Sequence, residues 1–577
     1  MSSSFDLIVR AGTIVDGRGG ESFVGDVAIR GDKIVAVGKF DGTAPEEIDA
    51  AGLTVTPGFV DIHTHYDGQA IWSERLSPSS SHGVTTVVTG NCGVGFAPCR
   101  AADHELLIRV MEGVEDIPGV VMAEGLPWDW ETFPQYLDAL EARPRDIDVG
   151  ALLPHSALRV YVMGERGAAR ERATADDLQR MRTLAREAID AGALGFASSR
   201  TFFHRTKSGE QIPSYDAADQ ELRAIAGALK DAGKGVVQMV LDVPHASWAT
   251  EMQHLLGVVE SSGRPASFTL GTPNDGAADW LIAMDRIAAA NARGAVIKAQ
   301  VLPRPIGLIA GFDLSTHPFC LCPSYEAIAH LPLAARLARL RDPAFRATLV
   351  KESPIEGHPL AMLARNWDWM FPFAEPPLYE PPLDTSIAAQ ARAQGRSPAE
   401  VAYDLLLNGG DGGGMLYNAL GNFYQGNLDA LYALMVDPNV VVGLGDGGAH
   451  YGAICDASYP TFMLTYWVRD RRGPRLSLAH AVRALATRPA ETVELRDRGT
   501  IAPGFKADLN VIDLDRLELH APEIRHDLPG GGRRLDQGAT GFVATICAGQ
   551  VIRRFDQPTA ARPGRVVRGA RAAPVGR

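Results

Sequence analysis

The sequence has few cysteines and no long, uncharged apolar run. Its six cysteines lie scattered over 577 residues, which is unlike the dense disulfide framework of a small secreted domain. No apolar segment is long enough to cross a bilayer, and residues 1–6 lack the basic and then apolar segments of a signal peptide. These absences favour a cytoplasmic protein with free thiols and no membrane partner.

Positive charge is also scarce. The chain has 56 Lys and Arg against 69 Asp and Glu, a net charge of −13, which disfavours nucleic acid as the principal partner. The hydrophobic fraction of 46% and the charged fraction of 22% are those of an ordinary globular protein. We therefore expect a small-molecule partner, and self-association into a homo-oligomer stays open.

The most informative stretch is residues 57–65, PGFVDIHTH. It is an apolar strand pattern that ends in His63 and His65, separated by one residue. Residues i and i+2 of a strand project from the same face, so both imidazoles can aim at one point. A lone His-x-His pair also arises by chance, but this context favours a metal site.

At this stretch the chain resembles the amidohydrolase superfamily, whose members carry a His-x-His pair at the end of the first strand of a metal-binding (β/α)8 barrel. Residues 81–93, SHGVTTVVTGNCG, look like the second barrel strand of the N-acyl-D-amino-acid deacylase (D-aminoacylase) branch. In that branch a cysteine at this place binds zinc, and Cys92 matches it. Residues 442–450, VGLGDGGAH, extend the resemblance to Asp446, near the end of the presumed last strand.

The chain length suits a barrel with an accessory domain. We expect an α/β fold, a (β/α)8 TIM-like barrel with a small β-sandwich domain built from both chain ends, because both ends alternate short β-rich runs with turns. The expected parts are residues 1–57 and 490–556 for the split β-domain, 58–489 for the barrel with an insertion at about 303–372, and 557–577 for a mobile tail.

The resemblance implies one Zn²⁺ per chain, held by His63, His65, Cys92 and Asp446. Zinc can polarise an amide carbonyl and activate water. Asp446 is the expected catalytic residue, which takes a proton from water and passes it to the leaving amine. The alternatives are a turn carboxylate for Asp446 and a buried apolar cysteine for Cys92.

One departure from the family concerns the fifth and sixth strands, where D-aminoacylases also use a histidine. The corresponding segments here, 236–242 (VVQMVLD) and 267–272 (SFTLGT), contain none. His245, in the following loop, is a weaker candidate ligand. A binuclear centre is therefore not expected.

Three polar residues near the presumed mouth of the barrel are candidates for substrate binding: His155, Arg200 and His204. An arginine there could hold a substrate carboxylate through two hydrogen bonds. The favoured function is hydrolysis of a small amide C–N bond, that of an N-acyl-D-amino acid or a related amide. Hydrolysis of a cyclic amide, as by hydantoinase-like relatives, and a non-catalytic binding or scaffold protein on this frame remain alternatives.

Overall fold

The structure is a computed structural model that describes residues 5–243, 245–355, 364–407 and 413–574. Its centre is a sheet of eight strands in the order β16-β12-β11-β10-β9-β8-β7-β6, all paired in parallel. These strands are β6 (Phe59–Asp61), β7 (Val84–Thr89), β8 (Asp148–Pro154), β9 (Gly195–Ser199), β10 (Val236–Val240), β11 (Ala266–Thr269), β12 (Ile297–Val301) and β16 (Val440–Val442).

The two edges of this sheet meet just beyond the strands. Asp446 donates its backbone N–H to the carbonyl of His63 (3.0 Å), and His65 donates to the carbonyl of Gly447 (2.8 Å). The segments that follow the first and last strands are thus joined, as the expected (β/α)8 barrel requires. Active sites of such barrels lie at this C-terminal end of the strands.

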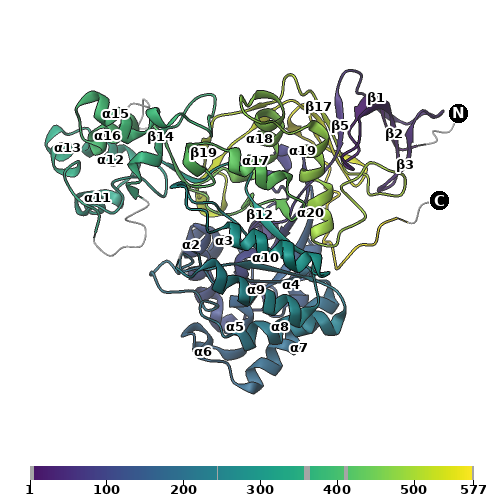
Figure 1. Cartoon of the computed structure of the whole chain (residues 1–577), viewed down its shortest axis with the longest axis horizontal. Coiled ribbons are helices and arrows are strands. Elements are labelled where there is room, and N and C mark those ends of the chain that lie inside the picture. The colour runs from purple at the N-terminus through teal and green to yellow at the C-terminus, as the bar shows by residue number, and fades with distance from the viewer. Residues whose placement is uncertain (1–4, 244, 356–363, 408–412, 575–577) are drawn as a thin grey trace.

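Helices between the strands cover the barrel, below the centre of Figure 1. Helix α7 (Ala175–Ala191) shows why they form where they do. Thr174 caps its first turn in a reciprocal capping box with Asp177, and Gly192 ends it at φ 119°, a backbone conformation that favours glycine. Helix α8 (Asp219–Ala232) ends at Gly233 in the same way. No helix of the described ranges is long and apolar enough to cross a membrane.

The two ends of the chain build one β-domain, as the sequence predicts. Its nine-stranded sheet has the order β24-β23-β22-β17-β5-β1-β2-β3, with β4 beside β1, and lies at the upper right of Figure 1. The strands are β1 (Leu7–Ile14), β2 (Phe23–Arg30), β3 (Lys33–Gly38), β4 (Glu46–Asp49), β5 (Thr54–Pro57), β17 (Leu509–Ile512), β22 (Phe542–Cys547), β23 (Gln550–Arg554) and β24 (Gln557–Pro558). The join between the chain ends is the antiparallel pair β5 and β17.

The segment expected to be a mobile tail, residues 557–577, instead packs along the barrel in its described part, which ends at residue 574. Val149 of β8 donates its N–H to the carbonyl of Arg565 (3.0 Å) and accepts from Val567 (2.8 Å). Val566 and Val567 are buried. The composition of this segment, rich in Arg, Pro and Gly, gives no sign that these two valines are buried. Their burial holds the segment in place.

The insertion after β12 is larger than expected. Its strands β13 (Ile306–Ala310), β14 (Met370–Pro372) and β15 (Leu416–Gly421) form a separate sheet in the order β13-β15-β14. Because the central strand of that sheet comes last in the chain, the lobe extends past residue 372 to β15. It has its own aromatic and aliphatic core and projects at the upper left of Figure 1.

Candidate metal centre and catalytic cavity

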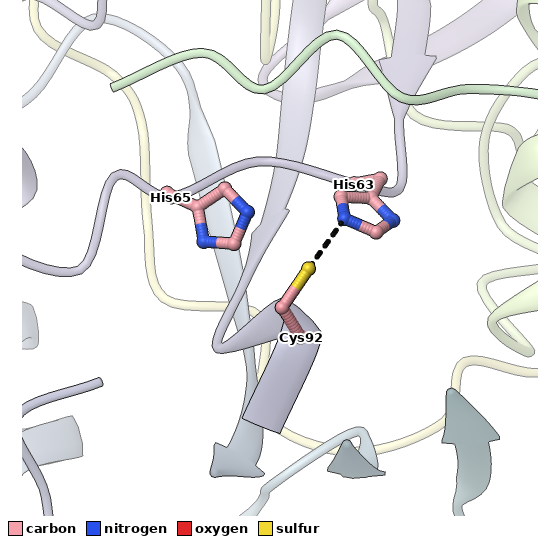
Figure 2. A group of neighbouring side chains, drawn as sticks. All are labelled: His63, His65 and Cys92. Atoms are coloured by element: carbon pink, nitrogen blue, oxygen red, sulfur yellow. Dashed lines mark hydrogen bonds between the residues drawn. The ribbon is translucent and has the colours of Figure 1, made fainter. Parts of the chain in front are cut away.

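Three side chains at the C-terminal end of the barrel converge on one point. His63 and His65 follow β6, and Cys92 lies in the short helix η2 (Asn91–Gly93) just after β7. One ligand atom from each lies within 4.8 Å of the others, and Figure 2 shows the cysteine sulfur directed at the His63 ring. All three are buried. The structure therefore brings together three of the side chains that the sequence predicts to be metal ligands.

Asp446 completes the group from the other edge of the barrel. Its Oδ1 atom lies 3.5 Å from Nε2 of His63 and 3.6 Å from Nε2 of His65. Nε2 of His63 is also 3.3 Å from Sγ of Cys92. The Asp446 carboxylate oxygen thus lies beside both histidine nitrogens of the three-residue group.

The proton arrangement of this group fits a cation. Nδ1 of His63 lies 2.8 Å from the Gln300 amide oxygen, which can only accept, so the proton sits on Nδ1 and Nε2 carries a lone pair. Asp446 Oδ1 is buried and has no hydrogen-bond partner. The Nε2 lone pair can accept from the Cys92 thiol, and once that thiol loses its proton, a donor set of two His, one Cys and one Asp suits Zn²⁺.

Burial also disfavours charge on these groups in the absence of a cation. It lowers the pKa of His63 to about 4 and raises the pKa of Asp446 to about 7. Burial, together with the nearby carboxyls of Glu115 and Asp446, raises the pKa of the Cys92 thiol well above its usual value. A bound cation reverses the effect on the thiol and the carboxyl, because it favours the thiolate and the carboxylate, and it favours the same neutral imidazole that burial favours.

Four residues around this centre adopt left-handed backbone conformations without being glycine. They are Cys92 (φ 55°), Leu444 (φ 65°), Asp446 (φ 45°) and His450 (φ 49°). Such conformations cost roughly 1–3 kcal/mol each and gather at functional sites, where the surroundings enforce them. Here they turn the Cys92 and Asp446 side chains inward.

The four groups open into a cavity of about 130 Å³. Its lining combines them with further polar and apolar side chains, namely Glu115, His204, Val240, Thr269, Leu302, Ile306, Leu444, His450 and Asp456. Ile306 belongs to β13, so the lobe contributes one wall. The cavity is thus shaped by the barrel and its insertion together.

Of the three predicted substrate-binding residues, the structure brings His204 to this cavity. Burial lowers its pKa to about 3, so its imidazole is neutral, and its Nδ1 has no hydrogen-bond partner. A neutral imidazole with a free ring nitrogen can accept from or donate to a bound molecule.

His155 and Arg200 are not among the residues that line the cavity. His155 is fully buried between Ser198 and Glu221, at 2.8 Å from each. Arg200 is paired with the buried carboxylate of Glu251 at 3.0 Å. Both side chains already have internal partners, and the structure assigns them a role in holding the barrel helices.

Among the cavity residues that sequence reasoning missed are Glu115 and His450. Glu115, at the end of α2 (His104–Glu115), is buried with Oε1 at 3.4 Å from Nδ1 of His65 and Oε2 at 3.5 Å from Nε2 of His450. His450 ends the VGLGDGGAH motif, which could have drawn attention to it. Glu115 lies in an ordinary helical pattern, and only the fold brings it to the cavity.

The fifth and sixth strands present no histidine to the cavity, as their sequences predict. Val240 of β10 and Thr269 of β11 line the wall instead. His245 is exposed and stacks on Phe202, with ring centroids 3.9 Å apart. It is not a ligand of the centre in this structure.

Comparison with known proteins gives one family. The model of the Amidohydrolase family matches residues 46–553. An uncharacterised protein of Mycobacterium tuberculosis (strain ATCC 25618 / H37Rv) is 28% identical over 96% of this chain and 92% of its own. D-aminoacylase of Alcaligenes xylosoxydans xylosoxydans is 37% identical over 34% of this chain and 38% of its own, and N-acyl-D-aspartate deacylase of the same organism is 39% identical over 39% and 42%.

Two solved structures share the fold over almost the whole chain. A D-aminoacylase structure superposes with a TM-score of 0.66 at 22% identity, covering 98% of this chain and 100% of its own. N-acyl-D-glutamate deacylase of Bordetella bronchiseptica, solved with zinc and a phosphonate inhibitor, gives 0.64 at 23% identity, covering 98% and 99%. The barrel and the split β-domain are therefore common to all three proteins.

Proposed function

The chain belongs to the amidohydrolase family, and from this premise we propose that it is a zinc-dependent hydrolase that deacylates an N-acyl-D-amino acid or a related small amide. The observation that carries the proposal is the convergence of His63 Nε2, Cys92 Sγ and Asp446 Oδ1. The named D-aminoacylase and N-acyl-D-aspartate deacylase relatives support the substrate class.

The four ligands would hold one Zn²⁺ per chain. When bound, the metal supplies Lewis acidity to the amide carbonyl and makes water more acidic. Two neutral imidazoles contribute no charge, whereas the Cys92 thiolate and the Asp446 carboxylate balance the cation. With no histidine on β10 or β11, the chain offers one compact ligand set.

Asp446 is the residue that moves the proton. Its Oδ1 faces both histidines, and a carboxylate beside the metal site can act first as base and then as acid. Oδ1 would accept a proton from water as the oxygen attacks the carbonyl carbon, and would return it to the nitrogen as the C–N bond breaks. The products are a carboxylate and an amine.

Other residues of the cavity would orient the substrate. His204 offers a neutral imidazole, and Val240, Leu302 and Ile306 give an apolar wall suited to an acyl chain. Because His204 would contact the substrate without taking part in the proton transfer, we expect its replacement to affect KM more than kcat.

The test is a substrate panel on the zinc-loaded protein. N-acetyl-D-amino acids, their L enantiomers and a cyclic amide such as hydantoin are compared by release of amine or opening of the ring. Hydrolysis restricted to D substrates supports the proposal. Ring opening alone would replace it by the cyclic-amide alternative, and a protein that binds no metal and hydrolyses nothing would favour the scaffold alternative.

A further inference from the structure

We propose that two buried glutamines beneath the metal centre, Gln300 of β12 and Gln238 of β10, are positioning residues that set the His63 tautomer and the Cys92 turn. The inference rests on the proposed metal centre and is independent of the substrate. Neither residue is a ligand, since the amide groups contact the ligands and not the point on which these converge.

Gln300 fixes His63 through a short chain of hydrogen bonds. Its Oε1 lies 2.8 Å from His63 Nδ1, and its Nε2 donates to Ser267 Oγ at 2.9 Å. In this arrangement the amide oxygen faces the histidine and the amide nitrogen faces Ser267. Because an amide oxygen accepts and does not donate, His63 must place its proton on Nδ1 and its lone pair on Nε2, toward Cys92 and Asp446.

An amide suits this place better than the carboxylate that often orients a metal-bound histidine. The centre already has the Cys92 thiol and the carboxyls of Asp446 and Glu115 within one small cavity. A further buried negative charge would add repulsion in the metal-free protein. Gln300 gives the same acceptor geometry without charge.

Gln238 holds the other side of the centre. Its Oε1 accepts the backbone N–H of Cys92 at 3.0 Å, and Cys92 sits at φ 55°. A left-handed cysteine is unfavourable unless its surroundings enforce it. The bond therefore stabilises the turn that points Sγ at Nε2 of His63.

These contacts give the histidine-free strands a role in the centre. Ser267 is on β11, between β10 and β12 in the sheet, so the two glutamines and Ser267 form a polar layer across three neighbouring strands. Gln238 and Gln300 are each 1% exposed. The fifth and sixth strands thus provide residues that hold Cys92 and Gln300 by hydrogen bonds, and they provide no ligand themselves.

The experiment compares Gln300→Leu and Gln300→Glu by zinc affinity in competition with a chelator. Leucine removes the acceptor, and we expect zinc to bind about 10–100-fold more weakly, the usual effect of losing such a partner. Glutamate keeps an acceptor for Nδ1 and can accept from the Ser267 hydroxyl, so it should bind zinc at least as tightly as the parent. Gln394→Leu, at an exposed glutamine, is the control.

A spectroscopic measurement distinguishes a role of Gln300 in setting the His63 tautomer from a role in packing alone. In ¹⁵N-histidine NMR of the metal-free protein, His63 should be the Nδ1–H tautomer in the parent and a mixture in Gln300→Leu. If that variant does not fold, Ser267→Ala, which frees the amide to rotate, should show the same mixture more weakly. Unchanged zinc affinity and an unchanged His63 tautomer, or weaker zinc binding in Gln300→Glu than in Gln300→Leu, would overturn the Gln300 assignment.

The same pair of substitutions at Gln238 tests the Cys92 turn. Gln238→Leu should weaken zinc binding, and Gln238→Glu, which keeps the acceptor for the Cys92 N–H, should restore it. Equal affinity in the leucine variant and the parent would exclude this role. None of these measurements uses a substrate, so a failure of the proposed deacylase activity would leave them unaffected and would be recognised separately.

Discussion

Oδ1 of Asp446 lies 3.5 Å from Nε2 of His63, although His63 follows the first barrel strand and Asp446 the last. The backbone joins the same two residues, because Asp446 donates its N–H to the His63 carbonyl at 3.0 Å. Closure of the barrel and assembly of the site are therefore one structural event. In the proposed mechanism this carboxylate would serve as both a ligand and a base.

Replacing Asp446 by asparagine should abolish turnover without unfolding the protein. The amide keeps the shape of the side chain but cannot take a proton from water, and loss of a general base costs typically 10²–10⁴-fold in rate. Steady-state kinetics and circular dichroism on the zinc-loaded variant would measure both. Asp275→Asn, at an exposed loop residue, is the control. Turnover near the parent level in Asp446→Asn would remove Asp446 from the mechanism.

Replacing Cys92 by alanine should lower bound zinc from about one per chain to far less. Elemental analysis after dialysis gives the stoichiometry. The matched control is Cys99→Ala, another buried cysteine of the same segment, which should keep its metal. Full zinc content in the Cys92 variant would mean that the two histidines and Asp446 suffice.

Zinc binding should release protons and become tighter as pH rises. The pKa of the Cys92 thiol is raised by burial in the metal-free protein, so at neutral pH the thiol must lose its proton when the metal binds. Calorimetry in buffers of different ionisation enthalpy counts the protons. In Cys92→Ala the count should fall, and an unchanged count would show that Cys92 is not deprotonated by zinc.

Asp148, Lys506 and Arg498 form a buried ion cluster at the base of the barrel. We expect this cluster to contribute much of the free energy that holds the barrel and the β-domain together. Asp148 lies 2.8 Å from Nζ of Lys506 and 2.7 Å from Nη1 of Arg498, and all three are buried. Asp148→Ala leaves two buried cations without this partner and should cost roughly 3–5 kcal/mol in the free energy of unfolding. Asp138→Ala, which breaks the exposed pair with Arg568, should cost less than about 1 kcal/mol.

The same ion cluster predicts that the protein loses folding stability at acidic pH. Burial disfavours the Asp148 carboxylate, but Lys506 and Arg498 outweigh burial and lower its pKa to about 2. Its stabilising contribution is therefore complete above the unfolded value near 4 and is lost as pH falls through about 2. Denaturant unfolding at pH 5 and pH 3 should show a smaller pH dependence in Asp148→Ala than in the parent. An equal dependence would contradict the assignment.

Local patterns in the sequence were enough to predict several parts of the fold and the site. The His-x-His pair after an apolar run, Cys92 after the next strand and Asp446 in a glycine-rich turn are each short-range features, and all four side chains meet in the structure. Thr174 and Gly192 set the limits of α7 in the same local way, since caps act within one turn. The family resemblance then ordered these fragments as a barrel.

Contacts between segments that are distant in the sequence could not be predicted from those local patterns. His155 and Arg200 lie near strand ends, yet Glu221 and Glu251 bind them inside the barrel wall. The last segment has a disordered composition, yet Val566 and Val567 are buried against β8. In each case the partner is remote in sequence, so no local pattern reveals it.

By itself the sequence determined the ligand types, because the chemistry of imidazole, thiolate and carboxylate belongs to the residues and their place at strand ends follows from periodicity. Only the tertiary structure decided what surrounds them. It brought Glu115 to the cavity, made Gln300 and Gln238 the supports of His63 and Cys92, and gave the lobe one wall of the cavity. The physical reason is that hydrogen bonds and burial act through space, across strands whose order along the chain does not fix their side-chain distances.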